Sequence, residues 1–231
     1  METGTFACLS VQSRYIGIRQ FCLICKCYTL INPNQFTNDI LKPWDKLNSL
    51  LAQQYAFQPD LSDITRLAGN IAVSIRHQID FVSLNNKQAN QLSQAHQIIS
   101  DAGDYWKHGS LRKEERNCPI TVAAAFEYAE NGTFSFIRNI VTLSHNSLGE
   151  SDFLITSAEA ARFWISQHGF DLGWRGTPNC ALPNFEQAAR LKYDPKCCIN
   201  MSSTQIKFFK KDANKKLIPF NPPEVRFEVY E

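Results

Sequence analysis

The stretch Thr121–Ser144, TVAAAFEYAENGTFSFIRNIVTLS, decides the fold class of this chain. Two runs rich in β-branched and aromatic residues, 121–129 and 133–144, flank the dipeptide Asn131-Gly132. An Asn-Gly dipeptide between such runs is typical of a β-hairpin, because both residues tolerate the positive φ angles of its tight turn. The stretch therefore predicts two antiparallel strands.

The residues before this hairpin carry apolar side chains at intervals of three and four, the period of amphipathic helices. We expect helices over about 35–54, from the N-cap Asp60 to about 82, and over 87–107. The third should bury a stripe along one face, made of Leu92, Ala95, Ile99, Ala102 and Trp106. Its spacing fits antiparallel packing on the second helix and predicts an antiparallel bundle.

The residues after the hairpin predict a short helix over 157–168, which opens with capping-box spacing and stops at Gly169. A further short helix is expected over 185–191. Strands are expected over 205–209, 217–220 and 225–229. The predicted fold is α+β: an antiparallel helical bundle at about 35–112, followed by an antiparallel β-sheet region with a short helix. The predicted divisions are a poorly structured extension (1–33), the bundle (34–116) and the β region (117–231), the last two sharing one core.

The composition describes a chain that can build its own core. It has 231 residues, of which 44% are hydrophobic, so stability demands no disulfide, metal or other cofactor. A net charge of +2 provides no global attraction to nucleic acid or anionic membranes, so any such binding needs a local patch. Eight cysteines in 231 residues are too few for a secreted disulfide scaffold. No stretch has the length and apolarity of a membrane span, and we expect reduced thiols in a cytoplasm.

Two clusters raise the question of a metal site. Asp101, Asp104 and His108 are spaced three and four apart, as metal ligands are in helical bundles. They fall opposite the apolar stripe of their helix, however, and therefore predict a solvated face. The segment Cys22–Cys27, with a third cysteine at Cys25, resembles half of a zinc site but lacks a second ligand pair at the required spacing, which favours ordinary thiols. The sequence predicts no metal.

The second strand of the hairpin contains an arginine, a polar residue and a histidine, Arg138-Asn139 and His145. This pattern resembles the motif of HEPN ribonucleases, helical proteins common in prokaryotic toxin and anti-phage systems. The helical front half and the segment 101–109 are also loosely similar to that family. The resemblance implies metal-independent RNA cleavage at a homodimer interface. Arg138 would bind the phosphate, His145 would exchange protons with the ribose 2′-hydroxyl or leaving group, and Asn139 would orient them.

The spacing of Arg138 and His145 restricts the secondary structure in which they can act together. Residues seven apart share a face of a helix but lie on opposite faces of a strand, so Arg138 and His145 cooperate within one chain only if the segment is helical or bulged. The hairpin pattern predicts a strand. No P-loop, dinucleotide fingerprint, nucleophile elbow or His-Glu-x-x-His helix occurs in the chain.

A second candidate is a lysine-rich hairpin near the end of the chain, with aromatic residues between its lysines. Positive charge beside aromatic side chains is typical of nucleic-acid surfaces, whereas such lysines also keep a hairpin soluble and protect a sheet edge. Its lysines are Lys207, Lys210, Lys211, Lys215 and Lys216. We therefore expect a non-enzymatic module of a prokaryotic or phage-type cell that binds a protein or nucleic-acid partner, and not a membrane. The alternative is a HEPN-like ribonuclease that works as a homodimer.

Overall fold

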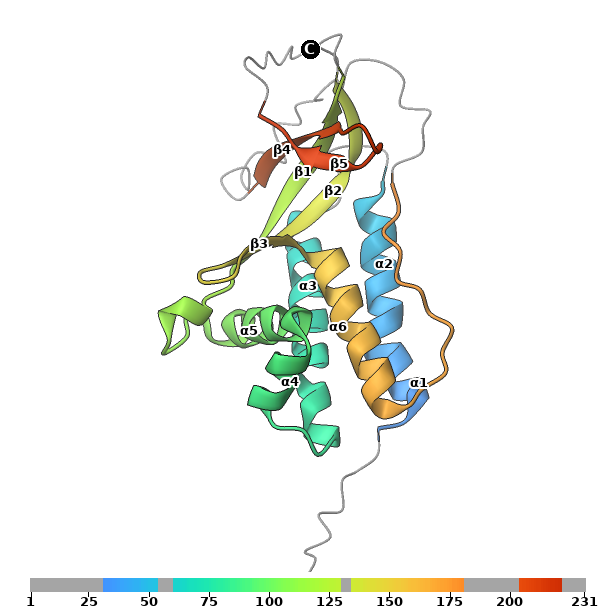
Figure 1. Ribbon diagram of the computed structural model, residues 1–231, viewed down its shortest axis with the longest axis vertical. Coiled ribbons are helices and arrows are strands. Elements are labelled where there is room, and N and C mark those ends of the chain that lie inside the picture. Colours follow the sequence, from blue (N-terminus) through green and yellow to red (C-terminus); the bar gives the residue numbers. More distant parts are fainter. Residues whose placement is uncertain (1–30, 54–59, 130–133, 181–203, 222–231) are drawn as a thin grey trace, which may run out of the picture.

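The computed structural model describes residues 31–53, 60–129, 134–180 and 204–221, with helices packed against one end of a curled five-stranded sheet (Figure 1). The α+β class is confirmed. The helical elements are α1 (Pro33–Phe36), a π-helical turn (Thr37–Leu41), α2 (Lys42–Leu51), α3 (Leu61–Arg76), α4 (Asn86–Leu92), α5 (Gln94–His108) and α6 (Phe153–His168). The strands are β1 (Ile120–Tyr128), β2 (Phe134–His145), β3 (Gly149–Asp152), β4 (Thr204–Lys211) and β5 (Leu217–Pro219).

The first helical stretch runs without a break from α1 into α2. Asn32 caps it by accepting a hydrogen bond of 2.8 Å from the backbone N–H of Asn34. Its π-helical turn lies just before Pro43, which has no N–H and whose ring would crowd the carbonyl four residues earlier, so a widened turn fits there. Ile31 is buried in the core, so the folded part begins before residue 34.

The helix predicted over 87–107 is two helices. Ser93 adopts an extended conformation between α4 and α5, and its hydroxyl caps α5 by accepting from the N–H of His96. Asn85 and Gln88 form a capping box at the start of α4. Serine competes with helical hydrogen bonding through its own side chain, which explains why an apparently continuous period contains a break.

The sheet has the order β3-β2-β1-β4-β5. The antiparallel pair β1 and β2 is confirmed, while its turn at Asn131-Gly132 lies outside the described residues. Ile137 is an extra residue in β2, because Phe126 pairs with Phe136 and the next pair is Ala125 with Arg138. The sheet is mixed, contrary to the all-antiparallel prediction, because β4 pairs parallel to β1. The segments 185–191 and 225–229 also lie outside the described residues.

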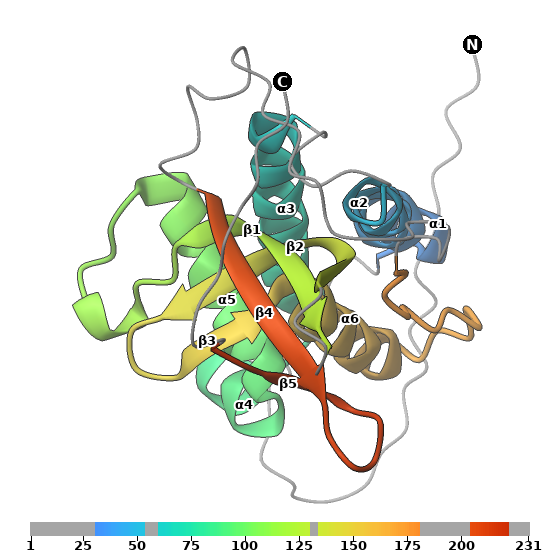
Figure 2. The same ribbon diagram turned by 90° about the horizontal axis from the view of Figure 1, so that it is seen from above.

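One apolar core joins the helices to one face of the sheet. In the view of Figure 2, β4, which pairs with β1, passes in front of β1 and β2. Trp44 of α2 ties α6 to this core, since its indole N–H contacts the carbonyl of Leu154 and the hydroxyl of Ser157 at 3.2 and 3.0 Å. The helix α6 begins at Phe153, four residues earlier than predicted, because Asp152 caps it. No described helix has the length and apolarity needed to span a membrane.

Candidate ligand-binding pocket

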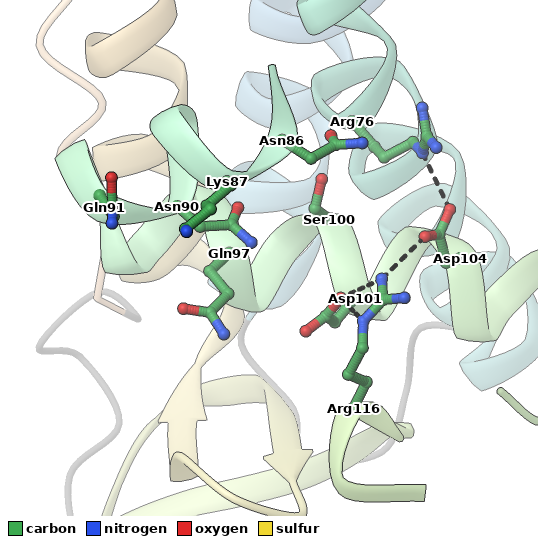
Figure 3. A pocket seen from close by; sticks show the side chains of 10 residues that line it. All are labelled: Arg76, Asn86, Lys87, Asn90, Gln91, Gln97, Ser100, Asp101, Asp104 and Arg116. Atoms are coloured by element: carbon green, nitrogen blue, oxygen red, sulfur yellow. Dashed lines mark hydrogen bonds and ion pairs between the residues drawn. The ribbon is translucent and has the colours of Figure 1, made fainter. Parts of the chain in front are cut away.

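A cavity of about 520 Å³ opens beside α5, between the end of α3, the short helix α4 and the connection from α5 to β1 (Figure 3). All of its lining side chains are polar. Three are basic, Arg76, Lys87 and Arg116, and two are acidic, Asp101 and Asp104. The others are asparagines, glutamines and one serine. A pocket of this size accommodates a small ligand or one to two units of a polymer.

Arg116 crosses from the connection to α5 and is held there by two carboxylates (Figure 3). Its Nε donates to Asp101 Oδ1 at 2.8 Å, and its Nη2 donates to both Asp101 and Asp104. Asp104 also accepts from Nε of Arg76 at 2.9 Å. The hydrogen bond with Asp101 raises the pKa of Arg116 above its ordinary value, so the guanidinium stays charged. The side chain of Asp101 is 3% exposed and that of Arg116 is 41% exposed, so the cation is the member that faces a ligand.

His145 fixes Asp101 from the opposite side. The ring Nδ1 accepts from the backbone N–H groups of Ser147 and Leu148, both at 3.2 Å, so the ring proton lies on Nε2. Nε2 therefore donates to Asp101 Oδ2 at 3.0 Å. Because both oxygens of Asp101 have partners, the carboxylate is a fixed support for Arg116.

The solvated-face prediction is wrong for Asp101 and holds for His108, which is exposed. The buried face of α5 is wider than the apolar stripe, because α5 packs against α3 and also against α6 and β2. Its buried residues include His96, whereas Leu92, expected in the stripe, is 62% exposed. The side chain of Asp104 is 21% exposed, between the values of Asp101 and His108, and lines the pocket.

Within the described ranges, no group of three His, Cys, Asp or Glu side chains is placed to hold a metal ion. Cys118, close to Asp101, is buried, and burial together with the Asp101 charge raises its thiol pKa to about 12. That thiol is neither a thiolate ligand nor a nucleophile at neutral pH. The cysteines of 22–27 lie outside the described residues.

The residues of the HEPN-like motif lie in a strand and do not meet. Arg138 points to the face of the sheet that carries Ala125 and Ile140, where it pairs with Asp152, the N-cap of α6, at 2.6 Å. His145 points to the helix-facing side, to Asp101. Asn139 shares that side and is fully buried. The bulge in β2 precedes Arg138, so it does not bring Arg138 and His145 to one face.

The lysine-rich hairpin is partly neutralised by its own sheet. Lys207 forms an ion pair with Glu150, and Lys211 pairs with Glu127 at 2.8 Å.

The other three lysines of the hairpin are less constrained. Lys210 lies over the ring of Phe220, with Nζ 4.9 Å from the ring centre. Lys215 and Lys216 are exposed in the turn, where the Asp212 carboxylate accepts from the N–H of Lys216. Two exposed lysines on a turn favour a solubilising role for the hairpin.

Comparison with protein-family models, curated proteins and solved structures found no match to this chain. The proposed function therefore rests on the chemistry of the pocket. The sequence singled out Asp101 and Asp104 but gave no reason to join them to Arg76, Lys87, Asn90 or Arg116. No spacing rule joins them, because they come from three helices and a connection that meet only in the folded chain.

Proposed function

We propose that this protein is a non-enzymatic module that binds the backbone of a single nucleic-acid strand in the polar pocket. The observation that carries the proposal is the Arg116 guanidinium, held by Asp101 and Asp104 at the wall of a pocket whose lining residues are all of polar type. Three basic lining side chains against two acidic ones give the pocket a net positive charge. This is the local patch that a chain of nearly balanced charge needs to attract a polyanion.

The lining chemistry favours a nucleic-acid backbone over a protein partner. Protein interfaces concentrate their binding energy in aromatic and aliphatic anchors that fill apolar pockets. Phosphate and sugar groups are instead bound by Arg, Lys, Asn, Gln and Ser, the residue types that line this pocket. The absence of aromatic side chains from its lining also favours backbone contacts over stacking on bases.

Two cations of the pocket have free capacity for a ligand. Within the described part of the chain, the hydrogen bonds of Arg116 use Nε and Nη2, which leaves Nη1 for a phosphate oxygen. Lys87 makes no ion pair with a described residue and is exposed. Asp101 and Asp104 already orient the guanidinium of Arg116, so less conformational entropy is lost when a ligand binds.

The test is the affinity of the full chain for a fluorescein-labelled 12-nucleotide single strand, measured by anisotropy. Lys87→Glu reverses one charge in the pocket, and Lys216→Glu reverses one charge in the hairpin turn. We expect Lys87→Glu to weaken binding about tenfold or more and Lys216→Glu to leave it unchanged within about twofold. Lys87→Ala should also lower the slope of log K against log salt by about one.

Two outcomes contradict the proposal. Absence of binding to RNA and DNA at low salt would rule out a nucleic-acid module. A loss of affinity with Lys216→Glu and none with Lys87→Glu would move the binding surface to the hairpin. Circular dichroism of both variants excludes unfolding as the cause, since both lysines are exposed.

A further inference from the structure

One acceptor in the pocket has no donor. Asn90 of α4 lines the cavity, and its side-chain oxygen Oδ1 is buried without a hydrogen bond from any described residue. Figure 3 shows its side chain among those that line the pocket, on the other side from Arg116. A buried acceptor without a partner is unfavourable, so a ligand that brings a donor to this oxygen gains affinity.

The donor that this oxygen needs distinguishes RNA from DNA. The phosphates of a nucleic-acid backbone only accept hydrogen bonds, and the deoxyribose within a DNA strand has no hydroxyl. The ribose 2′-hydroxyl is the one donor that an RNA backbone provides regularly. Resting on the function proposed above, we infer that the pocket selects RNA over DNA, with Asn90 Oδ1 accepting a hydrogen bond from a ribose 2′-hydroxyl.

Lys87 lies three residues before Asn90, on the same side of α4, and is exposed. A phosphate bound by Lys87 therefore brings its sugar close to Asn90. Because Asn90 Oδ1 is closed to solvent, a neighbouring side chain must move before the hydroxyl reaches it. The cations therefore select the phosphate, and Asn90 selects the sugar.

The experiment compares three 12-nucleotide single strands of one sequence: RNA, DNA and 2′-O-methyl RNA, which keeps the ribose shape but lacks the donor. Each is titrated against the wild-type chain, Asn90→Ala and the control Gln94→Ala, which removes an exposed amide outside the pocket lining. We expect wild type to bind RNA about tenfold more tightly than DNA or 2′-O-methyl RNA. Asn90→Ala should lose that preference, and Gln94→Ala should retain it.

The outcomes separate this inference from the function beneath it. Failure of all three strands to bind overturns the proposed function and the inference together. Equal affinity for RNA and DNA overturns the inference and leaves the nucleic-acid module standing. An RNA preference that survives in Asn90→Ala, or that 2′-O-methyl RNA shares, also overturns it. Displacement of the strand by micromolar ribose 5-phosphate would assign the pocket to a free sugar phosphate and overturn strand recognition.

Discussion

His145 and Asp101 lie 44 positions apart in the chain and share a buried hydrogen bond of 3.0 Å between Nε2 and Oδ2. Their side chains are 1% and 3% exposed. The bond joins the end of β2 to the middle of α5, behind the wall of the pocket. A histidine that the sequence places in a nuclease-like motif therefore supports the carboxylate that orients Arg116.

Replacing this histidine tests the support. His145→Ala leaves the buried Asp101 oxygen without its donor, and we expect the free energy of unfolding to fall by about 2–4 kcal/mol. Urea denaturation measures the change. His108→Ala is the control, because His108 is exposed at the end of α5, the helix that carries Asp101. A loss below about 0.5 kcal/mol in His145→Ala would show that the bond does not stabilise the fold.

Acid should weaken the fold through His96. Burial, and to a smaller extent the charge of Arg76, lower its pKa from 6.5 to about 4. The unfolded chain therefore binds a proton between these values that the folded chain does not, so stability is full above pH 6.5 and falls as pH drops toward 4. The difference corresponds to about 3 kcal/mol.

The variant His96→Gln isolates this contribution, because glutamine keeps an acceptor for the indole N–H of Trp164, 3.2 Å from His96 Nδ1. Unfolding free energies measured between pH 7 and 4 should fall less steeply in the variant than in wild type. Burial also lowers the pKa of His168, so part of the slope persists in the variant. Equal slopes would refute the assignment to His96.

Gly103 permits the close contact between α5 and α3. A Cβ at this position would lie 3.0 Å from the backbone carbonyl of Ala72, which cannot move independently of its helix. We expect Gly103→Ala to destabilise the protein by about 1–3 kcal/mol, although alanine favours a helix more than glycine does. Thermal unfolding measures the loss, with the exposed Lys107→Ala as control. An increase in Tm for Gly103→Ala would show that helix propensity dominates the contact.

The ribonuclease hypothesis has a direct assay. With EDTA present, we expect the purified chain to leave an end-labelled RNA of mixed sequence intact, because Arg138 and His145 lie on opposite faces of β2. Cleavage that disappears in both Arg138→Ala and His145→Ala would contradict this expectation. It would require an active site assembled from two copies of the chain.

Local sequence signals predicted the elements that depend on neighbouring residues. The Asp60 cap, the β1–β2 pairing and the stop at Gly169 were each correct, because capping and strand pairing across a short turn act over a few residues. The break at Ser93 was missed because a single serine is compatible with both a helix and a cap.

Tertiary contacts account for the errors at the site. The apolar stripe of α5 predicted one buried face, but the helix packs on several sides, so Asp101 is buried with its partners instead of solvated. The hydrophobic period of a helix depends on its apolar side chains, so it cannot reveal an aspartate that is buried with its partners. The pairing of Arg116 with Asp101 and His145 depends on how α5, β2 and the connection meet.

The parallel pairing of β4 with β1 has a consequence for how the chain folds. β1 and β2 are neighbours in sequence and can pair quickly, whereas Val122 pairs with Thr204 only after a long loop of chain, which includes β2, β3 and α6, has closed. Closing that loop is entropically unfavourable before its contacts form, so we expect docking of β4 and β5 to be the slow step of folding. In native-state hydrogen exchange, the amides of β4 should then open with a lower free energy than those of the α3–α5 contact.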